Sequence, residues 1–163
     1  MPSVRLSISA TTRQPRPGER DGVDYHFLTA EQFKTLVSEA AFAEHARYAG
    51  QQYGTLLSEL EREGDGDGVV MLEIELQGAR QIRESMPEAL QVFIAPPSFG
   101  TLRERLIGRG TDSPTTIDER LSVAREELEA QNEFSEVIVN DRVGDAVDAL
   151  EALVQSQLGG AVD

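Results

Sequence analysis

Apolar residues recur along the chain with two spacings, one typical of strands and one typical of helices. Near the start, Val4, Leu6 and Ile8 alternate with polar residues, which predicts a short strand. Residues 69–74 are nearly continuous in apolar side chains, as strands are when both faces of a parallel sheet are covered, and residues 90–95 form a second such run. All three segments are therefore predicted to be strands, the last two of them buried.

The segments between these strands favour helices and turns. Thr29 and Gln32 have the spacing of a capping box, and Phe33, Leu36 and Val37 then fall on one helical face. Helices are also predicted at residues 56–62, 77–85, 98–107, 116–131 and 145–158, strands at residues 42–48, 52–55 and 136–140, and a turn at the acidic glycine run 64–68. Alternating strands and helices are typical of an α/β fold with a parallel sheet, in which ligands bind at the carboxyl ends of the strands.

The composition narrows the class of protein. The sequence has 163 residues, enough for one domain with a sizeable core, and it contains no cysteine, which fits a reducing compartment and excludes disulfides. Its 15 basic and 29 acidic residues give a net charge of −14, which argues against binding to nucleic acid or to anionic membranes. No apolar run reaches membrane-spanning length and the first residues do not resemble a signal peptide, so we expect a cytoplasmic protein.

Against this acidic background, two arginines cluster in a loop near the start. Arg13 and Arg16 lie in a segment whose prolines restrict the backbone, and Ser9 and Tyr25 are close in sequence. Guanidinium groups bind phosphate oxygens through two parallel hydrogen bonds, and hydroxyl groups add further donors. The loop is therefore predicted to bind a phosphate monoester, and the alternative is a solvated basic loop.

Three acidic residues are further candidates for a site. Glu73 and Glu75 stand two residues apart at the end of the predicted strand 69–74, where both carboxylates would point to the same face. Such a pair suits Mg²⁺ held through water, or the hydroxyl groups of a sugar, and the alternative is a solvated strand end. Glu44 lies between apolar neighbours and can accept two N–H bonds from a guanine edge, unless it is simply exposed.

A second group of arginines lies further along the chain. Arg105 and Arg109 fall on one helical face, and Arg120 lies on the next predicted helix, beyond a glycine-containing break. Arginines on both sides of a hinge are typical of a lid that closes over phosphates and neutralises a transferred phosphoryl group. The alternative is pairing with the neighbouring glutamates. His26 and His45 have no matching nucleophile or third ligand, which argues against a catalytic triad or a zinc site.

Several short motifs, in this order, resemble the guanylate kinase family over residues 7–158. They are Ser9-x-x-x-Arg13-x-x-Arg16, Asp24-Tyr25-His26-Phe27, Phe42-x-Glu44, Tyr53-Gly54-Thr55, Leu72-Glu73-Ile74-Glu75-x-Gln77-Gly78, Phe93-Ile94-x-Pro96-Pro97-Ser98, Arg105-Leu106-x-x-Arg109-Gly110-Thr111 and Val139-Asn140-Asp141. The resemblance implies an α/β fold with a P-loop-kinase-like parallel sheet flanked by helices, a small GMP-binding subdomain and a helical lid. It implies a single domain over residues 1–163, with the GMP-binding subdomain at about 10–65, the core at about 66–104 and 133–158, the lid at about 105–132 and a tail at 159–163.

The resemblance also implies a reaction and a role for each candidate residue. The family transfers a phosphoryl group from ATP to GMP in purine nucleotide metabolism, giving ADP and GDP, with Mg²⁺ accompanying ATP and no direct protein ligand for the metal. The phosphate of GMP would be held by Arg13, Arg16, Tyr25 and Tyr53, and its guanine would be read by Ser9, Glu44 and Thr55. Glu73 and Glu75 would lie near the metal and the nucleotide sugar. The lid arginines Arg105, Arg109 and Arg120 would be catalytic, and Arg105, Arg109 and Asn140 would bind ATP.

Two features depart from the family pattern. Position 75 is Glu where the family more usually has Asp, which extends the carboxylate by one methylene. The 163 residues contain no Gly-x-x-x-x-Gly-Lys-Ser/Thr loop, which belongs to a strand–loop–helix unit that precedes the arginine loop in these kinases. We therefore expect a shortened chain that lacks one central strand, is less stable and is nearly inactive. The alternative is a non-catalytic module that binds GMP or another protein, although the retained lid arginines favour an enzyme.

Overall fold

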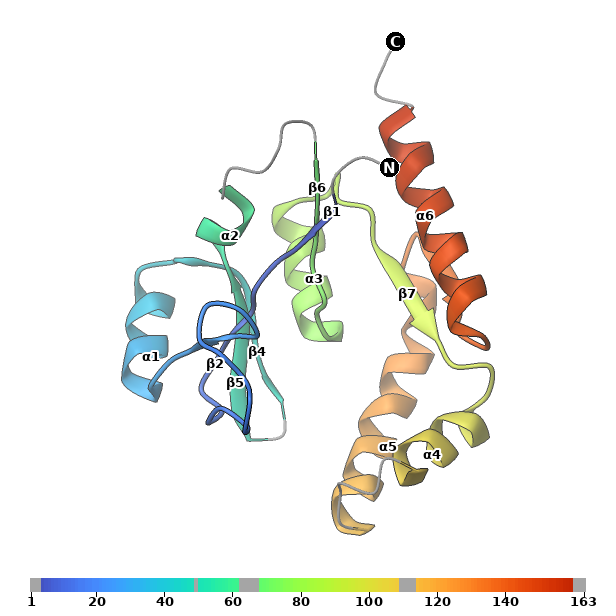
Figure 1. The fold of residues 1–163 in the computed structure, drawn as a ribbon, viewed down its shortest axis with the longest axis horizontal. Coiled ribbons are helices and arrows are strands. Elements are labelled where there is room, and N and C mark those ends of the chain that lie inside the picture. The colour runs from blue at the N-terminus through green and yellow to red at the C-terminus, as the bar shows by residue number, and fades with distance from the viewer. Residues whose placement is uncertain (1–3, 49, 62–67, 109–113, 160–163) are drawn as a thin grey trace. The chain divides into compact units, whose positions relative to one another are not determined.

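The computed structural model describes residues 4–48, 50–61, 68–108 and 114–159, and the chain forms two compact units (Figure 1). Unit 1 comprises Met1–Ala89 and unit 2 comprises Leu90–Asp163. The subdomain boundaries implied by the resemblance remain predictions. None of the helices in the described ranges is both long enough and apolar enough to cross a membrane.

Unit 1 is built around two sheets. Its elements are β1 (Val4–Leu6), β2 (Ala10–Thr11), β3 (His26–Phe27), α1 (Ala30–Ser38), β4 (Phe42–Tyr48), β5 (Gln51–Leu56), α2 (Leu57–Glu61), β6 (Val69–Met71) and α3 (Leu76–Ser85). β1 and β6 pair in parallel, with Val4 opposite Val69. The second sheet has the order β3-β2-β5-β4, in which β2 and β3 are parallel and β5 is antiparallel to both of its neighbours.

The hairpin formed by β4 and β5 confirms the strands predicted at residues 42–48 and 52–55. Gly50 lies in the connection with φ +79°, a left-handed conformation that glycine adopts without strain. The pairing shifts register between Phe42 and Glu44, because a bulge accommodates one extra residue of β4 there. As a result, Glu44 stands opposite Thr55 of β5.

Gly54 is required because the two strands approach too closely for a side chain at this position. A Cβ atom on Gly54 would lie 2.7 Å from the carbonyl oxygen of Glu44 and 2.9 Å from the Cβ of His45. We expect Gly54→Ala to lower the free energy of unfolding by about 2 kcal/mol, because the backbone must move to admit the methyl group. Urea denaturation measures this change. Gly144→Ala is the matched control, since nothing lies within 4 Å of a Cβ there, and equal stability of the two variants would contradict the expected clash.

Helix α1 begins with the capping box that the sequence predicts. The Thr29 hydroxyl accepts a hydrogen bond from the Gln32 amide at 3.1 Å, and the Gln32 side chain accepts one from the Thr29 amide at 2.8 Å. Phe33, on the apolar face, is 1% exposed and stacks on Phe42 with 4.5 Å between the ring centroids. Helix α1 therefore anchors the start of β4 in the core of unit 1.

The strand predicted at residues 69–74 ends earlier than its apolar run. β6 stops at Met71, and Glu75 then forms the N-cap of α3. The Glu75 carboxylate accepts a hydrogen bond from the Gly78 amide at 2.7 Å, a local interaction that hydrophobic periodicity does not reveal. The prediction that Glu73 and Glu75 end a strand with both carboxylates on one face is therefore wrong.

Unit 2 is built on another parallel pair of strands. Its elements are β7 (Val92–Ala95), α4 (Phe99–Gly108), α5 (Pro114–Glu129), the 3₁₀ turn η1 (Gln131–Glu133), β8 (Glu136–Val139) and α6 (Val143–Gly159). β7 and β8 pair in parallel, with Val92 opposite Glu136. The Ser98 hydroxyl accepts a hydrogen bond from the Thr101 amide at 3.0 Å, so α4 begins where the sequence predicts. Parallel strand pairs combined with helices confirm the predicted α/β class.

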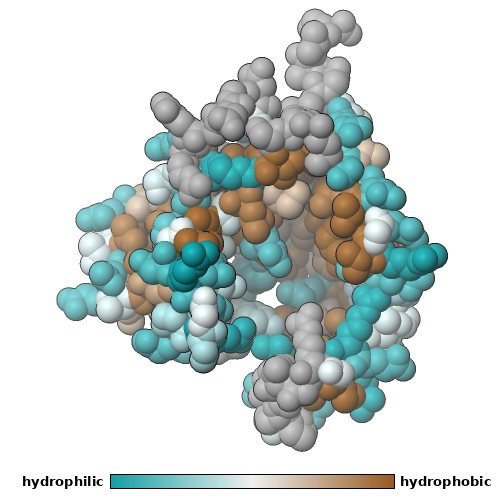
Figure 2. Space-filling model, viewed as in Figure 1, coloured by the Kyte–Doolittle hydropathy of each residue, from teal (hydrophilic) through white to brown (hydrophobic). Residues whose placement is uncertain are grey.

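Large apolar side chains reach the surface of unit 2. Figure 2 shows hydrophobic residues among the hydrophilic ones on the viewed face of the molecule. The exposed ones include Ile94 of β7, Val137 and Val139 of β8, and Val143 and Val147 of α6. The strand pair of unit 2 is therefore only partly covered by the residues that the structure describes.

Candidate functional site

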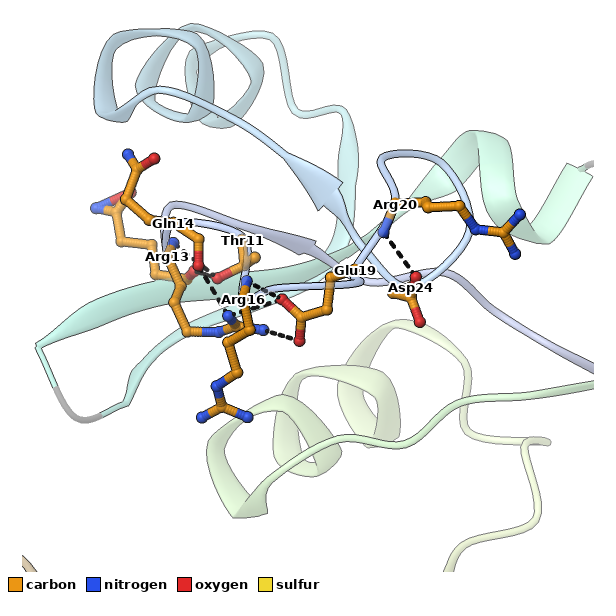
Figure 3. A network of polar contacts seen from close by, with 8 residues as sticks. Thr11, Arg13, Gln14, Arg16, Glu19, Arg20 and Asp24 are labelled. Carbon is orange, nitrogen blue, oxygen red and sulfur yellow. Dashed lines mark hydrogen bonds and ion pairs between the residues drawn. The ribbon is translucent and has the colours of Figure 1, made fainter. Parts of the chain in front are cut away.

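One carboxylate organises the arginine loop of unit 1. Glu19 accepts hydrogen bonds from both terminal nitrogens of Arg13, at 3.0 Å through Oε2 and at 2.9 Å through Oε1 (Figure 3). Its Oε2 also accepts the main-chain amide of Arg16 at 2.6 Å. Gly18, with φ +92°, allows the tight turn between these residues. The charge-assisted bonds raise the pKa of Arg13 and lower the pKa of Glu19.

Aromatic rings surround the Arg13 guanidinium. Its central carbon lies 5.1 Å from the ring centroid of Tyr25 and 5.8 Å from that of Phe27. The Tyr25 ring in turn meets Tyr53 of β5 edge-on, with 6.4 Å between the centroids. The structure thus brings together three of the four residues expected to hold a phosphate.

The fourth of these residues, Arg16, turns its side chain outward. Figure 3 shows its guanidinium pointing away from the Glu19 carboxylate, and it makes no hydrogen bond within the described parts of the chain. Ser9 lies between β1 and β2, and its carbonyl oxygen accepts the His26 amide at 2.9 Å. Among the described residues the Ser9 hydroxyl also has no partner, so both side chains can still bond to a ligand.

A buried carboxylate lies on the same four-stranded sheet. Glu44 is 4% exposed, and its Oε1 accepts a hydrogen bond from the fully buried Thr55 hydroxyl at 2.7 Å. Burial raises the pKa of Glu44, although the bond from Thr55 opposes the rise. Tyr53 and Thr55 are two residues apart on β5, so the Tyr53 ring and the hydrogen-bonded Glu44–Thr55 pair lie on the same face of the sheet.

Helix α3 closes over this carboxylate. A Cβ atom on Gly78 would lie 2.5 Å from Glu44 Oε2, so the helix can approach only because residue 78 is glycine. Glu75, at the start of the same helix, is near enough for its charge to raise the pKa of Glu44 further. Glu73 is exposed beyond β6. In the ranges that the structure describes, no three His, Asp or Glu side chains are placed to hold a metal ion.

Glu59 was not predicted, and it joins three segments of unit 1. From α2, its Oε1 pairs with Nε2 of His26 at 3.0 Å and its Oε2 accepts the Ile8 amide at 3.1 Å. Arg5 of β1 donates to the main-chain oxygen of Glu59 at 2.6 Å and reaches its carboxylate at 3.5 Å. The residue is 4% exposed and fixes the start of the arginine loop against β3. An acidic residue in a short amphipathic helix gives no sequence signal for such a role.

In unit 2, Arg105 holds the main chain that follows β8. Its two terminal nitrogens donate to the carbonyl oxygens of Asn140 at 2.9 Å and of Asp141 at 3.1 Å. The Asn140 Oδ1 is buried and has no hydrogen-bond partner among the described residues. The structure therefore brings two predicted ATP-binding residues together. Arg120 is half-buried on α5, and Arg109 lies outside the described residues.

Unit 1 therefore combines an arginine-containing loop with a buried carboxylate on one sheet. Such a loop can take an anion, the carboxylate can accept N–H groups of a base, and an α/β fold that carries both is typical of nucleotide-binding proteins.

Comparison with known proteins identifies the family. The guanylate kinase family model matches residues 2–157, and the chain belongs to the guanylate kinase family. A guanylate kinase of Frankia casuarinae is 53% identical over 153 residues, covering 94% of this chain and 83% of the relative. A guanylate kinase of a Synechococcus strain is 50% identical over 156 residues, covering 96% and 83%. By its family the chain is an enzyme of the kinase class.

A solved structure supports the same family. The crystal structure of guanylate kinase from Anaplasma phagocytophilum superposes with a TM-score of 0.78 at 32% identity, over 94% of this chain and 76% of that one. This likeness confirms the predicted P-loop-kinase-like fold class.

Proposed function

We propose that the chain binds GMP in unit 1 and belongs to an enzyme that transfers the γ-phosphoryl group of ATP to it, giving ADP and GDP in purine nucleotide metabolism in the cytoplasm. The observation that carries the proposal is that Arg13, Tyr25 and Tyr53 gather beside the buried Glu44–Thr55 pair on one sheet. A phosphate and a base of one small nucleotide need such neighbouring sites. The family relationship supplies the reaction.

The acceptor nucleotide would be oriented from both ends. Arg16 donates freely to phosphate oxygens, while Arg13, already held by Glu19, offers its remaining N–H groups and the two tyrosine hydroxyls add donors. At the other end, the ionised Glu44 accepts N–H groups of guanine, and Ser9 and Thr55 complete the contacts with the base. Holding the phosphate and the base at once fixes the reacting oxygen in space, which is the main contribution of a protein to phosphoryl transfer.

The donor nucleotide is proposed to meet residues of unit 2. Arg105 uses two of its five N–H donors on the carbonyl oxygens of residues 140 and 141, which leaves others for ATP phosphates. Arg109 and Arg120 would add charge that stabilises the transferred group, and the buried Oδ1 of Asn140 would accept a donor from ATP. Mg²⁺ would enter with ATP, and Glu73 and Glu75 would lie near it and the nucleotide sugar without ligating it directly.

A second candidate function is binding of GMP without catalysis. The residues proposed to hold GMP all lie in unit 1, whereas turnover also requires contacts to the ATP phosphates. The two candidates share the GMP site and differ only in turnover.

Calorimetry with Arg16→Ala tests the GMP site that both candidates require. The variant is expected to bind GMP roughly ten- to a hundredfold more weakly, because a hydrogen bond to a charged group contributes about 1.5–3 kcal/mol. Arg20→Ala is the matched control, since Arg20 belongs to the same loop and its side chain points away from the network in Figure 3. Equal affinities of the two variants, or no binding of GMP by the parent chain, would overturn the proposal.

A further inference from the structure

Gln81 makes an unusual two-point contact with the main chain of β4. From α3, its Oε1 accepts the amide of His45 at 3.1 Å, and its Nε2 donates to the carbonyl oxygen of the same residue at 2.8 Å. Both bonds thus go to one residue, as they would from a neighbouring strand. The Gln81 side chain therefore replaces a strand partner at this point.

The contact from Gln81 lies at the open edge of the four-stranded sheet. β4 is the edge strand of the order β3-β2-β5-β4, so β5 lies on only one side of it. His45 stands opposite Gly54 of β5, and its own amide and carbonyl groups turn to the open side, where Gln81 meets them. Without Gln81, the His45 amide and carbonyl groups would have no hydrogen-bond partner on that side among the described residues.

The residue that Gln81 holds is the immediate neighbour of Glu44. The Glu44 carboxylate lies between two contacts, the Thr55 hydroxyl on one side and the backbone of Gly78 on the other. Gly78 and Gln81 are three residues apart on α3 and so belong to the same side of the helix. The pair of hydrogen bonds from Gln81 to His45 is here called the clasp. The clasp and the close approach of Gly78 together fix the distance between α3 and the Glu44 carboxylate.

We propose that Gln81 is a positioning residue that sets the selectivity of this protein for guanine. The inference rests on the proposed binding of GMP. A carboxylate that accepts two N–H groups from one base must be placed accurately, because both bonds weaken steeply as they bend. The clasp supplies that placement through the main chain of residue 45, without touching the nucleotide.

The selectivity between GMP and inosine 5′-monophosphate (IMP) separates positioning from general stability. IMP keeps the phosphate and the ring N–H but lacks the 2-amino group, so it uses one fewer hydrogen bond to Glu44. Loss of the clasp should weaken mainly the hydrogen bond from the 2-amino group of guanine to Glu44. We expect Gln81→Met, which preserves side-chain length without hydrogen bonding, to weaken GMP binding about tenfold and IMP binding less than about threefold. Arg16→Ala, which removes a phosphate contact, should weaken both nucleotides equally.

The experiment is titration calorimetry of the 163-residue chain with GMP and with IMP, together with hydrogen exchange at the His45 amide. Gln155→Met, the same substitution at an exposed position of α6, is the control. It should change neither the affinities for the two nucleotides nor the exchange rate of the His45 amide. Faster exchange at residue 45 with a reduced GMP-to-IMP ratio is the expected result. If Gln81→Met does not fold, Gln81→Ala allows the same comparison. An unchanged ratio in a folded Gln81 variant would overturn the inference while leaving the proposed function intact. Failure of the parent chain to bind either nucleotide would overturn the proposed function and the inference with it.

Discussion

A polypeptide of these 163 residues is expected to form ADP from ATP and GMP at least about a hundredfold more slowly than the same polypeptide joined to a strand–loop–helix segment that carries Gly-x-x-x-x-Gly-Lys-Ser/Thr. Removing a single preorganised donor to a transition-state charge already costs roughly 10²–10³ in rate. A coupled assay for ADP measures the difference.

The physical reason is that no other segment within the described residues combines a glycine-rich turn with a lysine. Lys34 is the single lysine of the chain, and it lies within α1 rather than after a glycine-rich turn. The acceptor residues of unit 1 and the arginines of unit 2 can orient nucleotides, but neither group supplies a cradle of backbone amides for the β- and γ-phosphates.

A matched control is the extended polypeptide with the loop lysine replaced by alanine. It restores the strand and the helix but not the charge, so it distinguishes a catalytic effect of the loop from improved folding. Turnover by the 163-residue polypeptide that equals that of the extended one would show that the loop is dispensable. It would also point to phosphate contacts other than those proposed for Arg105 and Arg120.

The Glu44→Gln variant is expected to weaken GMP binding while making the ligand-free chain more stable. Gln keeps an oxygen for the Thr55 hydroxyl but cannot accept both N–H groups of guanine, so the affinity should fall roughly ten- to a hundredfold. Removing a buried charge should raise the free energy of unfolding by about 1 kcal/mol. Calorimetry and urea denaturation measure the two effects on the same sample.

The effect of Glu44 should also depend on pH in a defined direction. Because burial raises the pKa of Glu44, the folded chain binds this proton more tightly than the unfolded chain does. The parent chain therefore gains stability relative to Glu44→Gln as the pH falls through that raised pKa, and its affinity for GMP declines over the same range. The corresponding change should be missing in the variant.

Glu59→Gln provides the contrasting control. Glu59 is as buried as Glu44, at 4% exposure, but it is paired with Arg5 and His26. Removing one member of a buried pair leaves the partner without compensation, so this substitution should destabilise the fold. A Glu44→Gln variant that is less stable than the parent chain, or that binds GMP equally well, would contradict the role proposed for Glu44.

Patterns of short range predicted most of the secondary structure. The capping box at Thr29 and Gln32, the strands on either side of Gly50 and the start of α4 at Ser98 all depend on residues within a few positions of one another. The end of β6 could not be predicted in this way, because an apolar run continues beyond the point where Glu75 caps the next helix. An apolar run indicates which residues are buried, but it does not indicate where the hydrogen bonds between two strands end.

The site was predicted less completely than the fold, for a different reason. Arginines, tyrosines and a lone glutamate can be recognised as ligand chemistry, but their protein partners come from tertiary contacts. Gln81, for example, is 36 positions from His45, and Glu59 is 51 positions from Ile8. No periodicity connects residues so far apart. The main-chain bonds of Arg105 were missed for the same reason, because a carbonyl oxygen carries no residue identity.

The pairing of Glu19 with Arg13 also bears on how quickly a nucleotide is captured. The cation of Arg13 is offset by a carboxylate 2.9 Å away, and the whole chain carries a net charge of −14. The long-range field around the loop is therefore not expected to draw an anion inward, and the guanidinium groups of Arg16 and Arg20 have no carboxylate at hydrogen-bonding distance within the described residues. Capture then depends on undirected diffusion and on bonds formed after contact. Dilute salt, which accelerates association of oppositely charged molecules, would bring little advantage here.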